Sequence, residues 1–65
     1  MGVMEKLYEE VCGIVISDHD RMTKACMLSD LYERIGRASD SLDNIIYENL
    51  GLSGEDVIDM LIRGN

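Results

Sequence analysis

Apolar residues recur at helical spacing along almost the whole chain of 65 residues, and no proline interrupts them. Positions i, i+3, i+4 and i+7 fall on one face of an α-helix, so this period is typical of amphipathic helices. The stretch VCGIVI, residues 11–16, also suits a short strand because four of its residues are β-branched. One apolar stripe nevertheless keeps a single helical register along the chain: Met4, Leu7, Val11, Ile14, Ala25, Leu28, Tyr32, Ile35, Leu42 and Ile46.

Polar residues interrupt this stripe at Asp18 and Arg21 and again at Ser39. A single long helix would place these side chains in its apolar seam, so a chain that breaks at both points explains them better. We therefore expect an all-α fold, a small bundle of three to four short helices that forms one domain, 1–65.

Residues that favour helix starts stand at the breaks. Ser17 followed by Asp20 has the spacing of a capping box, in which side chains bond the backbone amides of the first helical turn. Ser53 followed by Asp56 repeats this spacing. The serines and aspartate of residues 39–41 are further candidate caps.

Glycines mark where the helices end. Gly51 and Gly64 suit the position just past a helix, and Gly36 can end the second helix early. Together, the caps and glycines predict four helices, at about 3–16, 18–37, 41–50 and 54–63.

The small size of the chain favours burial against a second copy. A domain this short buries only about 60% of its unfolded surface, so its core is marginal without help. Apolar residues make up 46% of the chain, with no Phe, no Trp and three Tyr, so the core must be aliphatic. We expect a homodimer, and we assign to its interface or to the core a group near the C-terminus: Val57, Ile58, Leu61 and Ile62.

The charge is strongly negative. Thirteen acidic residues oppose six basic ones, for a net charge of −7, and residues 38–65 carry −5 of it. Such a surface repels nucleic acid and anionic membranes and attracts a basic protein surface. Acids on a small helical protein also serve solubility alone. The candidate partner-binding residues are the acids of that segment: Asp40, Asp43, Glu48, Glu55, Asp56 and Asp59.

The stretch SDHD, residues 17–20, contains the only histidine, with Cys12 and Cys26 each seven residues away. On either side of a helical turn, seven residues place His19 about 10 Å from the cysteines along the axis. Zinc holds its ligands at about 2.0–2.3 Å, so the three side chains cannot share one ion. We interpret SDHD as a turn and a helix cap, and we expect no metal site.

The two cysteines are expected in the core, because unpaired Cys is among the most buried residue types. Their positions across the turn would allow a disulfide under oxidation. The chain shows neither the pattern of a signal peptide nor an apolar run of the roughly 20 residues that span a bilayer. We expect a cytoplasmic protein with reduced thiols and no membrane partner.

Enzyme chemistry finds little support in the sequence. The chain has one histidine, no glycine-rich phosphate loop and no strand–turn–helix nucleophile motif. Four helices in 65 residues also leave little room for an enclosed pocket, which typically needs about 300 Å³ or more. We expect neither catalysis nor a cofactor.

The stretch SDSLDNII, with Asp40, Ser41 and Leu42, resembles the attachment motif of acyl carrier proteins. Those are acidic four-helix proteins, and the resemblance implies that Ser41 carries phosphopantetheine. It covers about four residues.

The stretch ENLGLSGEDVIDMLIRG, residues 48–64, is similar to the C-terminal part of ribbon–helix–helix antitoxins and repressors. In that family LGLS joins two helices whose apolar residues pack a dimer, so the resemblance implies dimer packing here. The basic N-terminal strand that reads DNA in the family has no counterpart in this chain.

These observations favour a non-enzymatic inhibitor or adaptor that docks on a basic protein through its acidic surface. In the sharpest form of this hypothesis the acids imitate a nucleic-acid backbone, as in small phage and mobile-element inhibitors of the anti-restriction and anti-CRISPR kind. The alternative is a small dimeric regulatory subunit, antitoxin-like, that acts through apolar helix pairing. A carrier protein modified at Ser41 is a third, more remote possibility.

Overall fold

Four α-helices make up the part of the chain that the computed structural model describes, residues 2–64. They are α1 (Val3–Ile16), α2 (Arg21–Ile35), α3 (Ala38–Leu50) and α4 (Gly54–Arg63). No strand forms in this range, and VCGIVI is helical within α1. The all-α prediction is therefore confirmed. The bounds of α1 and α4 are those expected, whereas α2 is shorter at both ends and α3 begins three residues earlier.

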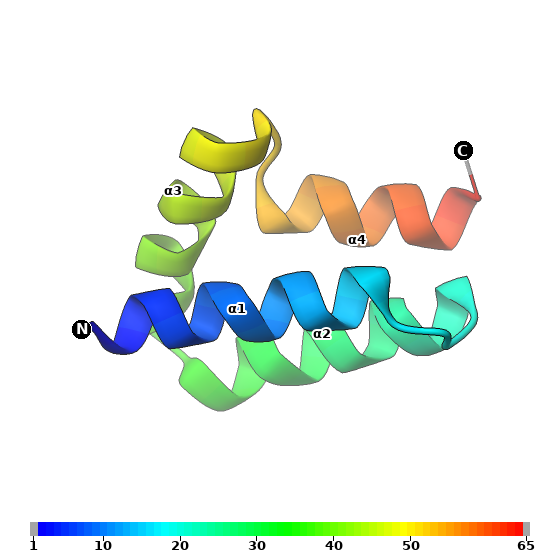
Figure 1. The fold of residues 1–65 in the computed structure, drawn as a ribbon, viewed down its shortest axis with the longest axis horizontal. Helices are drawn as coiled ribbons and strands as arrows, with labels where there is room; N and C mark the ends of the chain where they lie inside the picture. The colour runs from blue at the N-terminus through cyan, green and yellow to red at the C-terminus, as the bar shows by residue number, and fades with distance from the viewer. Residues whose placement is uncertain (1, 65) are drawn as a thin grey trace.

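The helices form a small bundle with principal extents of 31 × 20 × 19 Å. Figure 1 shows α1 and α2 as an antiparallel pair, with α3 rising from the end of α2 and α4 running back along the pair. α4 packs on α2 and α3, and its described backbone makes no close approach to that of α1.

The start of α2 differs from the expected capping box. Ser17 belongs to the end of α1, where its Oγ donates to the carbonyl of Ile14 at 2.6 Å. Asp20 is the N-cap itself, and its Oδ1 accepts from the amide of Thr23 at 2.9 Å. Ser17 and Asp20 both have side chains that can cap a helix. In the tight turn between the helices, Ser17 bonds to the end of α1 and Asp20 caps the start of α2.

A glycine separates α2 from α3. Gly36 ends α2 with φ +56°, in the region where a residue with a Cβ is strained. Arg37 precedes α3 in helical conformation and makes no side-chain cap. Residues 39–41 lie inside the first turn of α3, so the prediction that they cap this helix is wrong. The tight turn leaves no extended residue in which a cap could form.

The start of α4 is as expected. The Oγ of Ser53 accepts from the amide of Asp56 at 3.2 Å, and an Asp56 carboxylate oxygen accepts from the amide of Ser53 at 3.4 Å. Gly51 and Gly64 follow α3 and α4 in left-handed conformation. Local capping chemistry therefore sets both ends of α4.

The core is aliphatic and comes from the first three helices. Its buried apolar residues are Val11, Ala25, Leu28, Leu31, Leu42 and Ile46. All ten residues of the apolar stripe are buried or half-buried, which confirms its register. α4 contributes only half-buried aliphatics to this core, so it covers a core that the other helices build.

The cysteines do not lie in the core as expected. Cys26 is exposed, Cys12 is half-buried, and both are free thiols. Cys26 stands on the side of α2 near α4, where Ala25 rather than the cysteine turns inward. The helical register of α2 therefore decides its exposure.

Candidate interaction surface

Two of the six candidate acids lie on the outer side of α3. Asp40 and Glu48 are eight residues apart, slightly more than two helical turns, and Asn44 stands midway between them. All three residues are exposed. Neither carboxylate has a cationic or hydrogen-bonding partner among the described residues.

Three further acids lie on the outer side of α4. Glu55, Asp56 and Asp59 are exposed, and the inward positions of the same helix are apolar. Asp56 takes part in the capping box, and Asp59 forms an ion pair of 3.1 Å with Arg63 one turn later. An exposed pair of this kind contributes at most about 1 kcal/mol, so Asp59 stays available to a stronger partner.

Asp43 is half-buried, and its carboxylate bonds to other helices of the bundle instead of facing solvent with the other acids. Its Oδ1 accepts two hydrogen bonds of 2.6 Å, one from the Tyr32 hydroxyl of α2 and one from the backbone amide of Gly54. It thus joins α2, α3 and the first turn of α4. Burial of the ring, the hydrogen bond to Asp43 and the charges of Asp43 and Glu55 all raise the pKa of Tyr32, which therefore stays a neutral donor.

We call the contact of Tyr32, Asp43 and Gly54 the junction. Sequence reasoning missed it, because eleven positions separate Tyr32 from Asp43 and another eleven separate Asp43 from Gly54. One signal could have pointed to it. Gly54 occupies the first position of a well-capped helix, where glycine has a low helix propensity. A glycine there indicates close approach of another group, and the structure places the Tyr32 hydroxyl against it.

The proposed dimer or core residues separate into two sets. Val57, Ile58 and Leu61 are half-buried and pack against the core within one chain. Ile62 is 53% exposed and borders a shallow hollow between α2 and α4. Only Ile62 of these four is therefore largely available to a second molecule.

An apolar groove of about 360 Å³ lies between the C-terminal end of α1 and α4. Sequence reasoning did not identify it, because it combines residues from all four helices and a loop. Arg21 is its one polar side chain, and the rest of its lining is aliphatic: Val15, Leu50, Leu52, Val57, Met60 and Leu61.

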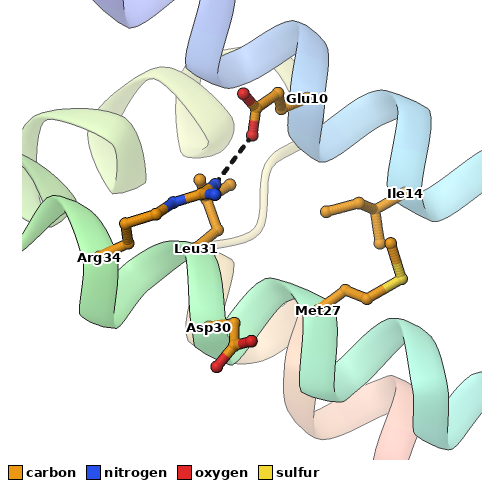
Figure 2. A pocket seen from close by; sticks show the side chains of 6 residues that line it. All are labelled: Glu10, Ile14, Met27, Asp30, Leu31 and Arg34. Carbon is orange, nitrogen blue, oxygen red and sulfur yellow. Dashed lines mark hydrogen bonds and ion pairs between the residues drawn. The ribbon is translucent and has the colours of Figure 1, made fainter.

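A second hollow, of about 320 Å³, opens between α1 and α2 (Figure 2). Arg34 reaches across it to Glu10 at 3.2 Å, and Asp30 points away from this pair. Met27 and Ile14 form its apolar side. Both partners of the ion pair are mostly exposed, so the hollow is a surface seam between two packed helices.

The other candidate chemistry of the sequence is dispersed. Within residues 2–64, no three His, Cys, Asp or Glu side chains gather to hold a metal ion. His19 is exposed in the turn before α2, and Ser41 is exposed in the first turn of α3. No helix in this part of the chain is both long and apolar enough to cross a bilayer.

Comparison of the chain with protein-family models, with curated proteins and with solved structures found no match.

Proposed function

We propose that the protein is a non-enzymatic interaction module that binds a basic protein surface through five carboxylates of α3 and α4. We call these the outer acids: Asp40, Glu48, Glu55, Asp56 and Asp59. Asp43 is not among them, because its carboxylate is occupied by Tyr32 and Gly54.

The observation that carries this proposal is the lack of internal neutralisation. Five exposed carboxylates stand on two neighbouring helices, and among the described residues only Arg63 forms an ion pair with any of them. Like charges on one surface repel each other and destabilise the compact state. A cationic partner removes that repulsion, so binding gains free energy that the isolated chain lacks.

The spacing on α4 suits a row of cations. Asp56 and Asp59 are three residues apart, and Glu55 and Asp59 are four apart, which corresponds to about 4.5 and 6 Å along the helix axis. Proteins that bind nucleic acid present Lys and Arg against a similarly dense row of phosphates. A cleft that binds nucleic acid is therefore our preferred type of partner surface, and the outer acids would occupy it in place of phosphates.

The experiment compares two variants that have the same net charge. The test variant neutralises the outer acids: Asp40→Asn, Glu48→Gln, Glu55→Gln, Asp56→Asn and Asp59→Asn. The control neutralises five exposed acids of α1, the turn and α2: Glu5→Gln, Glu9→Gln, Asp18→Asn, Asp30→Asn and Glu33→Gln. Circular dichroism first establishes that both are folded.

Each immobilised protein then captures partners from a lysate of its own organism across a salt series, with duplex DNA as competitor. We expect the wild type and the control to retain the same basic protein, to lose it as salt rises and to lose it to excess DNA. The test variant should retain none. If both variants lose the basic protein equally, binding depends only on net charge. If both retain it equally, the outer acids serve only solubility. Either result rejects the proposal.

A further inference from the structure

We draw no further inference here: the strongest candidate, the apolar groove between the C-terminal end of α1 and α4, carries nothing, because nothing in the structure shows what covers it.

Discussion

Replacing Gly54 by alanine tests the junction that attaches α4 to the rest of the bundle. Gly54 is buried at the start of α4, and its amide donates to Asp43 at 2.6 Å. A Cβ added there would collide with the hydroxyl and ring of Tyr32 and would lie 2.7 Å from Oδ1 of Asp43. The backbone of α4 and the tyrosine cannot both stay in place, so we expect α4 to shift outward and the Tyr32–Asp43 hydrogen bond to break.

The expected loss of stability follows from three terms. Overpacking a close contact destabilises by about 1–3 kcal/mol. A lost hydrogen bond to a charged acceptor destabilises by about 1.5–3 kcal/mol. The higher helix propensity of alanine offsets at most about 1 kcal/mol. We expect Gly54→Ala to lower the free energy of unfolding by about 2–4 kcal/mol, a large share of the roughly 3–10 kcal/mol typical of a domain this size.

Urea denaturation followed by circular dichroism at 222 nm measures this loss. Gly13→Ala is the matched control, because Gly13 lies within α1 and a Cβ there meets nothing within 4 Å. It should stabilise the protein by up to about 1 kcal/mol. In a cycle with Tyr32→Phe, the two losses should sum to more than the double variant shows, since both changes remove one hydrogen bond. If Gly54→Ala is as stable as the parent, the junction does not hold α4 and the reasoning fails.

Three further predictions follow from the caps and the core. Hydrogen bonds from Thr23 hold the pKa of Asp20 below its ordinary value. The contribution of the Asp20 carboxylate to folding stability is therefore present above about pH 4 and is lost as the pH falls through the lowered pKa. Melting temperatures of wild type and Asp20→Asn, measured from pH 7 to pH 2, should show that the wild type loses its advantage in acid. Ile58→Asp should unfold the single chain, because Ile58 packs on the core. Ile62 is exposed, so Ile62→Asp should change the free energy of unfolding by no more than about 0.5 kcal/mol in urea denaturation. Leu42→Ala should destabilise by about 2–5 kcal/mol by the same measurement, since Leu42 is fully buried.

Each of these has an outcome that contradicts it. A constant difference between wild type and Asp20→Asn down to pH 2 would mean that the carboxylate does not cap α2 in solution. If Ile58→Asp stays folded and merely changes from dimer to monomer by light scattering, the residue belongs to an interface between copies. A Leu42→Ala variant as stable as the parent would place Leu42 outside the core.

The helices were predictable because the signals that define them are local. The apolar stripe lies within single helices, and Ser53 with Asp56 needs only three residues to cap α4. The prediction erred at the turn before α2, where Ser17 and Asp20 compete for one role, and at α3, which begins without a side-chain cap. In both places the short turn between two helices decides which residue ends one helix and which starts the next.

The candidate surface was predictable only in part. An acid at a polar position of an amphipathic helix is expected to be exposed, and five of the six candidates are. Asp43 lies three residues after Asp40, and no local pattern separates the two. Its half-buried position depends on Tyr32 and Gly54, which reach it only after α2 and α4 have packed.

The sequence by itself determined the fold class, the number of helices and the ends of α4, because helical period and capping act over three to seven residues. The tertiary structure alone decided that α4 covers α2 and leaves α1 open, that Asp43 faces inward, and that Val15, Leu50 and Met60 border one groove. These are contacts between residues far apart in the chain. Their geometry depends on how whole helices cross, and spacing within one helix carries no information about that crossing.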